Sequence, residues 1–162
     1  MTTQIIDNCL PIEFFKEIQS KVITNAFLWQ FNMTLNNAQS AENTDSYFSH
    51  VVYFNDMPNS GFYNDICPIL KYLPDFHSLI RIKVNLYPRQ DVLTEHTPHL
   101  DNPYPHKGAI LYLNTCDGFT RLPDRTVDSI ENRLLVFDAS VKHNSTNTTT
   151  PPGRFNININ YL

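Results

Sequence analysis

The chain has 162 residues, of which 41% are apolar and 12% aromatic, and its formal net charge at pH 7 is −4. This length suits one domain with a substantial buried core, and the acidic balance argues against a protein that neutralises nucleic-acid phosphates over an extended surface. We therefore expect one domain over residues 1–162, with helical and edge-strand support in residues 1–78 and a core in residues 79–162.

The cysteines and the N-terminal residues indicate a reducing compartment. Cys9, Cys67 and Cys116 are odd in number and far apart, which is typical of reduced thiols. The first ten residues lack the basic and apolar regions of a secretory signal, and no long apolar run predicts a membrane span. We expect a cytoplasmic protein with no membrane partner.

The first predicted element is an amphipathic helix over residues 10–23. Pro11 suits the first turn of this helix, and Asp7 or Asn8 could cap it. Its apolar side chains recur at helical spacing and form one stripe: Phe14, Phe15, Ile18 and Val22.

The segments that follow alternate between strands, a polar loop and a second helix. Strands are predicted over residues 26–31 and 47–54, and the polar composition of residues 36–45 predicts a loop between them. Residues 61–73 are expected to contain a helix that is disturbed or restarted at Pro68, because proline removes a helical hydrogen bond.

The second half of the chain consists of short strand-like runs separated by turn residues, which indicates a β-sandwich or barrel. The expected strands are residues 79–87, 109–114, 134–137 and 154–161. In the first and last of these, apolar and polar residues alternate. The polar positions are Arg81, Lys83, Asn85 and Tyr87 in one strand and Arg154, Asn156, Asn158 and Asn160 in the other.

These polar faces have two interpretations. They could be exposed to water, which is common for an isolated strand, or they could line a polar cavity while the apolar faces pack under helices. Matched polar faces on several strands favour the cavity. The predicted fold is therefore mainly β with supporting N-terminal helices, a double-stranded β-helix of the jelly-roll or cupin-like type. A local basic rim is also expected from Arg81, Lys83, Arg121 and Arg125.

The most informative motif combines His99-x-Asp101 with a later histidine, His143. Two histidines and one carboxylate are the ligands of a facial triad, which binds Fe(II) on one side and leaves positions open on the other. If His99 and Asp101 lie on one strand, both side chains point to the same face, and His143 would come from another strand. No Cys-x-x-Cys pair indicates a structural zinc site.

Arg154 follows His143 by eleven residues. Its guanidinium group is planar and always charged, which suits it to a carboxylate-bearing cosubstrate.

These motifs together resemble the 2-oxoglutarate/Fe(II)-dependent oxygenase superfamily, and its prolyl 4-hydroxylase-like branch in particular. The resemblance extends over residues 80–161 and rests on His-Leu-Asp at 99–101, Tyr-Leu-Asn at 112–114, Asp-Gly-Phe-Thr at 117–120, the run 132–138, His143 and Arg154. Small members also occur in tailed phages, and the Asn-, Ile- and Thr-rich composition suits an AT-rich viral genome. The cytoplasm would then be that of a host.

The resemblance implies a role for eight residues. His99, Asp101 and His143 would bind Fe(II), and Arg154 would pair with the distal carboxylate of 2-oxoglutarate. The other implied cosubstrate contacts are Tyr112, Tyr87, Asn85 and Asn156, although Tyr112 is equally well explained as a buried aromatic residue.

The implied reaction uses Fe(II), 2-oxoglutarate and O2. It would hydroxylate an unactivated C–H bond and release succinate and CO2. A prolyl residue is the leading substrate by resemblance, and a free amino acid, another small molecule or a nucleobase stays open.

Two other functions are compatible with a jelly roll. A non-enzymatic binding or structural module would have no 2-oxoglutarate turnover. A cupin-type metal enzyme that does not use 2-oxoglutarate would leave Arg154 without a partner, and a binding titration would separate it from the oxygenase.

Overall fold

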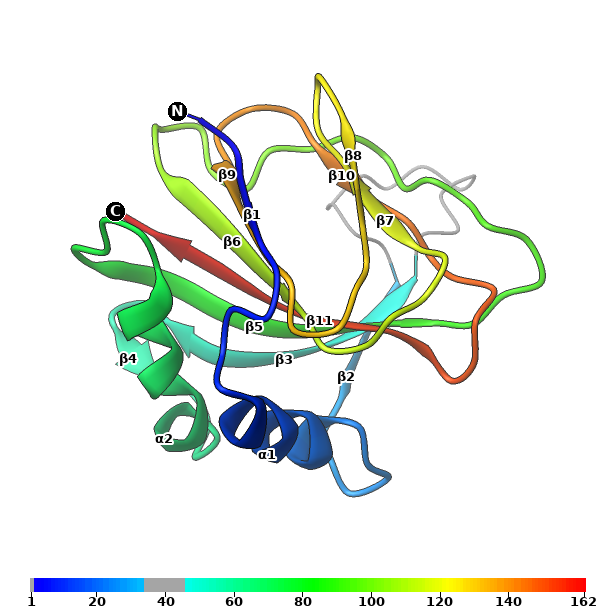
Figure 1. The fold of residues 1–162 in the computed structure, drawn as a ribbon, viewed down its shortest axis with the longest axis horizontal. Coiled ribbons are helices and arrows are strands. Elements are labelled where there is room, and N and C mark those ends of the chain that lie inside the picture. Colours follow the sequence, from blue (N-terminus) through cyan, green and yellow to red (C-terminus); the bar gives the residue numbers. More distant parts are fainter. Residues whose placement is uncertain (1, 34–45) are drawn as a thin grey trace.

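The arrangement of residues 2–33 and 46–162 is described by a computed structural model, and the loop predicted over residues 36–45 lies outside them. The strands of these described residues form two antiparallel sheets (Figure 1). Along the larger sheet the order is β1 (Gln4–Ile6), β9 (Leu134–Asp138), β6 (Lys107–Tyr112), β11 (Gly153–Tyr161), β5 (Leu79–Pro88), β3 (Tyr47–Phe54) and β2 (Gln30–Asn32), with β4 (Met57–Pro58) paired to β3. The smaller sheet has the order β10 (Asn144–Ser145), β7 (Phe119–Arg121) and β8 (Thr126–Asp128).

Helices cover one side of the larger sheet, and the smaller sheet lies on its other side (Figure 1). This arrangement confirms the predicted jelly roll with supporting N-terminal helices. The helices are α1 (Ile12–Val22), α2 (Tyr63–Ile66) and the 3₁₀ helix η1 (Cys67–Tyr72). The predicted interruption of the second helix is confirmed, since α2 ends at Ile66 and η1 starts beside Pro68.

Two local predictions in the N-terminal half are wrong. Neither Asp7 nor Asn8 caps α1, because Pro11 occupies the N-cap position without a side-chain cap, and Asp7 instead accepts hydrogen bonds from Arg133. The strand predicted over residues 26–31 is confined to Gln30–Asn32. Here Phe27 and Trp29 pack against the main core without joining a strand, so tertiary packing overrides their strand propensity.

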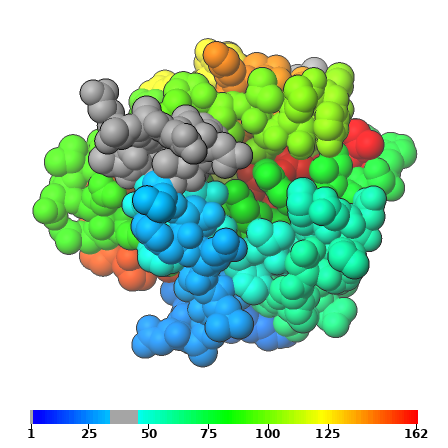
Figure 2. Space-filling view, turned by 180° about the vertical axis from the view of Figure 1, so that it is seen from behind, coloured from blue at the N-terminus to red at the C-terminus, as the bar shows by residue number. Residues whose placement is uncertain are grey.

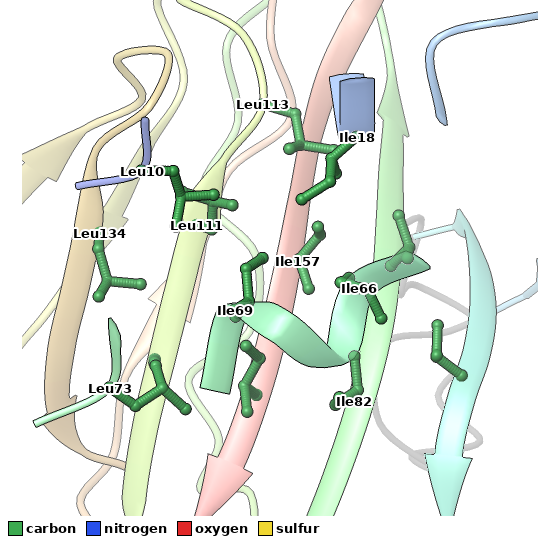
Figure 3. Packing of buried hydrophobic residues seen from close by; sticks show 14 of the residues in the cluster. Leu10, Ile18, Ile66, Ile69, Leu73, Ile82, Leu111, Leu113, Leu134 and Ile157 are labelled. Carbon is green, nitrogen blue, oxygen red and sulfur yellow. The ribbon is translucent and has the colours of Figure 1, made fainter. Parts of the chain in front are cut away.

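The apolar face of the central strands packs against the helices. Figure 3 shows Ile66 and Ile69 of the helical segment beside Ile82 of β5 and Ile157 of β11. Phe15, Ile18 and Val22 of α1 are buried in the same core, as the helical stripe predicts.

The polar face of β5 and β11 points into the space between the two sheets. Asn85, Arg154, Asn156 and Asn160 are all buried, so the interpretation of these faces as exposed to water is wrong. On the neighbouring strands β6 and β9 the same inner face is apolar, and it forms a second core with the small sheet: Ile110, Tyr112, Leu122, Val127, Leu135, Phe137 and Ala139.

Gly108 allows β6 and β9 to approach closely beside this second core. A Cβ atom at position 108 would lie 2.8 Å from the Cβ of Ala139 and 2.9 Å from the ring of Phe137. Only glycine fits there without displacing its neighbours.

Phe15→Ala should lower the free energy of unfolding by about 3–5 kcal/mol, because it opens a cavity under α1 where Phe15 is fully buried. Ile12→Ala in the same helix removes a side chain that is 54% exposed and should have a much smaller effect. Urea unfolding of both variants measures the difference. Equal losses would contradict the assigned packing of α1.

Candidate metal centre

The structure brings together the three side chains predicted as metal ligands. One ligand atom from each of His99, Asp101 and His143 lies within 4.8 Å of the others. The two histidines are also joined through their backbones, because each backbone N–H donates to the carbonyl oxygen of the other at 2.8 Å. This reciprocal bridge holds the two imidazole rings next to each other, with centroids 4.7 Å apart.

The three side chains converge, but not from regular strands as the sequence predicts. His99 and Asp101 do not lie on a regular strand: His99 forms an isolated bridge, and Asp101 lies in a bend. His143 precedes the short strand β10 and does not lie within it. The single backbone bridge, together with the hydrogen bond from the Asp101 N–H to the Ala139 carbonyl at 3.1 Å, positions the three side chains instead.

Backbone carbonyls set the orientation of both imidazoles. Nδ1 of His143 is 2.9 Å from the carbonyl oxygen of Val141, and Nδ1 of His99 is 3.4 Å from that of Thr97. Because a carbonyl oxygen can only accept, Nδ1 of each ring must carry the proton. Nε2 then presents its lone pair to a metal ion, which is the usual arrangement of a ligating histidine.

Asp101 is held ionised by two neighbours. The Nη2 atom of Arg81 donates to one carboxylate oxygen at 3.0 Å, and the side-chain amide of Asn160 donates to the other at 2.8 Å. Burial alone would raise the pKa of Asp101, but the charge of Arg81 and the Asn160 hydrogen bond oppose burial, and the pKa is lowered to about 2. The carboxylate is therefore a charged ligand at any physiological pH.

The same enclosure keeps His99 neutral. Burial is the main cause that lowers its pKa, and the nearby His143 adds to the effect. Two imidazoles and one ionised carboxylate form a mixed nitrogen and oxygen donor set that fits Fe(II) and leaves room for further ligands.

Arg154 is fully buried on the inner face of β11, and its hydrogen-bond partners among the described residues are neutral. Its guanidinium donates to the hydroxyl of Ser129 at 2.6 Å, the hydroxyl of Thr120 at 3.0 Å and the carbonyl of Thr146 at 3.2 Å. Among the described residues no carboxylate lies within 4.0 Å of it. A buried charge without a counterion is costly, so this position is suited to an anion that comes from solution.

Gly118 leaves the space that the buried side chain of Arg154 occupies. A Cβ atom at position 118 would lie 2.6 Å from Cδ of Arg154 and 2.7 Å from the carbonyl oxygen of Asn147. Any side chain there would displace the arginine.

The other predicted cosubstrate residues fall into two pairs. Tyr87 and Tyr112 flank Arg154, with ring centroids 5.3 and 5.6 Å from the guanidinium carbon, and the Tyr112 hydroxyl donates to Thr120 at 2.8 Å. Asn85 and Asn156 face each other across β5 and β11, and the amide of Asn85 donates to the Asn156 oxygen at 3.0 Å. The side-chain oxygen of Asn85 is buried and has no hydrogen-bond partner within the described part of the chain.

The basic rim predicted from the sequence is wrong for Arg81 and Lys83. Arg81 and Lys83 do not form a rim with Arg121 and Arg125, since they point inward from β5. Arg121 and Arg125 are exposed and pair with acidic neighbours. The alternating pattern of β5 was the available signal for the inward direction, because it puts Arg81 and Lys83 on the face of Asn85 and Tyr87. The contribution of Ser129 had no such signal, since it lies outside any strand.

Comparison with known proteins gives similarity at the level of structure. No protein-family profile matches the sequence, and no curated protein resembles it closely. Among solved structures, an oxidoreductase of the 2OG-Fe(II) oxygenase family from Burkholderia pseudomallei has a TM-score of 0.66 at 10% identity, over 98% of this chain and 84% of that one.

Two further structures have similar scores. A prolyl hydroxylase from Trichoplax adhaerens, in complex with a peptide fragment of the hypoxia-inducible factor oxygen degradation domain, gives a TM-score of 0.65 at 17% identity, over 99% of this chain and 83% of that one. The non-heme alpha-ketoglutarate-dependent epimerase SnoN from nogalamycin biosynthesis gives 0.64 at 15% identity, over 99% and 77%. The chain has the fold of the 2-oxoglutarate/Fe(II) oxygenases.

The oxygenase fold gives the helices of this chain a supporting position on the outside of the sheet. Within residues 2–33 and 46–162, no helix combines the length and apolar character needed to cross a bilayer.

His143→Ala should weaken Fe(II) binding by at least about 100-fold, because it removes one of three protein ligands. Anaerobic calorimetric titration with Fe(II) measures the loss. His77→Ala is the matched control, since the imidazole of His77 is exposed and its hydrogen bond within the described residues is to the nearby carbonyl of Asp75. Undiminished affinity in the His143 variant would place the metal elsewhere.

Asn160→Ala should weaken Fe(II) binding by a smaller factor, about 10–100-fold, because the amide orients a ligand without touching the ion. The same titration tests it. An effect as large as that of His143→Ala would mean that Asn160 does more than position Asp101, and no effect would mean that its hydrogen bond is dispensable.

Proposed function

We propose that this protein is a 2-oxoglutarate- and Fe(II)-dependent dioxygenase that hydroxylates an unactivated C–H bond. One observation carries the proposal: a facial-triad donor set and a buried arginine without a carboxylate partner occupy the same interior, in a fold shared with such oxygenases. A metal site alone would also suit a cupin-type enzyme. The arginine supports a dicarboxylate cosubstrate specifically.

Different residues would bind Fe(II) and orient its carboxylate ligand. His99, Asp101 and His143 would hold Fe(II), while Arg81 and Asn160 fix the Asp101 carboxylate. When bound, Fe(II) and 2-oxoglutarate supply the oxidative chemistry, in which the keto acid is decarboxylated to succinate and CO2 and O2 provides the oxygen for hydroxylation.

Arg154 would bind the distal carboxylate of 2-oxoglutarate. Its partners Ser129, Thr120 and Thr146 hold the guanidinium in one orientation, which reduces the entropy that would be lost when the anion binds. Tyr87 and Tyr112 flank the guanidinium and exclude water from it, so its attraction for a carboxylate is stronger than it would be at the surface.

The two buried asparagines would complete the cosubstrate site. Asn85 lies two residues from Tyr87 along β5, and Asn156 lies two residues from Arg154 along β11, so all four are on the same face. Both side chains are buried, and the side-chain oxygen of Asn85 has no hydrogen-bond partner among the described residues.

The remaining features of the proposal concern the setting of the reaction. Three free cysteines agree with a reducing, cytoplasmic location.

A prolyl residue is one candidate substrate, supported by the likeness to the Trichoplax adhaerens prolyl hydroxylase. We place residues 1–162 in one oxygenase domain, in which the N-terminal helices back the sheet that carries the site.

The direct test is an aerobic assay for succinate from 2-oxoglutarate with added Fe(II), run in the presence of peptide, amino-acid and nucleotide panels. The proposal expects succinate that depends on both Fe(II) and O2. Binding of Fe(II) without any binding of 2-oxoglutarate would favour a cupin-type enzyme, and binding of neither would favour a non-enzymatic module.

Arg154→Ala should raise the dissociation constant of 2-oxoglutarate by at least about 30-fold, because the distal carboxylate loses its charged partner. Affinity for Fe(II) should stay within about twofold, since Arg154 does not touch the triad in the described contacts. Calorimetric titration with each ligand measures both values. Arg125→Ala, which removes an exposed arginine, is the control. Unchanged 2-oxoglutarate affinity in the Arg154 variant would refute its assigned role.

A further inference from the structure

Beyond the cosubstrate residues, the same inner face of β5 and β11 carries a second pair of positions. Asn158 is the cross-strand partner of Lys83, and Asn160 is the partner of Arg81. Residues directly opposite each other on antiparallel strands have their Cβ atoms about 5 Å apart and on one side of the sheet. Arg81 and Asn160 both contact Asp101, so this face looks onto the metal centre.

The ammonium group of Lys83, on this inner face of β5 and β11, has no carboxylate partner among the described residues. Its ammonium group donates to the hydroxyl of Tyr47 at 3.1 Å and lies 5.1 Å from the centre of that ring. Among the described residues it forms no ion pair within 4.0 Å. Burial and the charge of Arg81 lower the pKa of Lys83 to about 8, against the opposing effect of Asp101, so the group is still a cation at neutral pH.

The amides around Lys83 also have unused hydrogen-bonding capacity. Among the described residues, the side-chain oxygens of Asn158 and Asn160 and the Nε atom of Arg81 are buried without a hydrogen-bond partner. Buried polar atoms are almost always hydrogen-bonded in folded proteins. The Nε atom of Arg81 is a donor that needs an acceptor, and the two amide oxygens need a donor. A polar ligand that carries both, such as an acid with an amine or amide group, would therefore complete the inner face of β5 and β11 around Lys83.

Charge balance narrows the class of ligand. Arg81 already pairs with Asp101, so Lys83 is the cation of this face that lacks an acidic partner among the described residues. A carboxylate would supply the missing negative charge.

We propose that the primary substrate carries a carboxylate, and that Lys83 and the amide of Asn158 bind it beside the metal centre. This inference rests on the proposed function, because it assigns the second ligand of the same interior. Arg154 then serves the cosubstrate and Lys83 the substrate. The carboxylate belongs either to a free acid, such as an amino acid, or to an acidic side chain of a peptide.

The test uses the full chain loaded with Zn(II) in place of Fe(II), so that the centre is diamagnetic and no turnover occurs, and saturated with 2-oxoglutarate. Binding is measured by saturation-transfer NMR with three sets of probes. They are the free L-amino acids with simple monocarboxylates, the same compounds as primary amides, and end-blocked peptides that contain one Asp or Glu or the matching Asn or Gln.

At least one carboxylate probe should bind, and its amide should bind at least about 10-fold more weakly. The set that contains the tight binder distinguishes a free acid from a peptide side chain. If no carboxylate probe binds, or if amides bind as well as acids, the proposal is overturned.

Variants assign the effect to Lys83. Lys83→Met keeps the length of the side chain and should abolish the preference for the carboxylate, while Lys83→Arg should retain it. Lys71→Met removes an equal charge from an exposed position on η1 and should change nothing. Asn158→Asp, which places a negative charge opposite Lys83, should weaken the carboxylate probe by at least about 10-fold even if Lys83→Met fails to fold.

Affinity for 2-oxoglutarate in the same variants separates this inference from the proposed function. It should stay within about twofold in Lys83→Met. A large loss would assign Lys83 to the cosubstrate and overturn the inference while leaving the oxygenase intact. Failure of the wild-type protein to bind 2-oxoglutarate would instead refute the proposed function itself.

Discussion

Burial of charge inside a β-fold is the constraint on which this structure depends. Arg154 is fully enclosed, and Arg81, which lies farther along the same inner face of β5 and β11, pairs with Asp101. Taking such groups out of water costs several kcal/mol each. The protein offsets part of that cost with fixed neutral donors and acceptors, namely the hydroxyls around Arg154 and the amide that holds Asp101. The part that stays uncompensated would favour the binding of an anion in this interior.

The apolar face of β5 and β11 supplies stabilisation that offsets the free-energy cost of burying charge on their polar face. Ile82, Val84, Ile157 and Ile159 pack beneath α1, α2 and η1, where every side chain of the main core is nearly inaccessible to water. Because successive residues of a strand point to opposite faces, one pair of strands can belong to a dry core on one side and a polar site on the other. A shift of one residue in the pairing of these strands would exchange their two faces, and it would disrupt both the dry core and the polar site.

This division explains which features the sequence predicts. The alternation in residues 79–87 and 154–161 was sufficient to place β5 and β11 and to put Arg154 and Asn156 on one face. The convergence of His99 with His143 could be expected from the ligand types but not from strand geometry, since a lone backbone bridge produces it. Ser129 was missed because its contact with Arg154 spans 25 residues of chain and has no local pattern.

The inner face of β5 and β11 is where we expect substrate preference to be decided. Solved structures that share this fold include a hydroxylase bound to a peptide and an epimerase of a biosynthetic route, both below 20% identity to this chain. A fold that accommodates both leaves specificity to individual side chains. In Figure 2, atoms of the C-terminal strand (red) are visible between the lime-green upper segments and the cyan strands below, so part of β11 is reached from this side.

The most direct test of the central claim is a crystal structure of the protein grown anaerobically with Mn(II) and 2-oxoglutarate. We expect an anomalous signal within bonding distance of His99, Asp101 and His143, and the distal carboxylate of 2-oxoglutarate against the guanidinium of Arg154. A metal bound at other side chains, or a cosubstrate carboxylate directed away from Arg154, would contradict it.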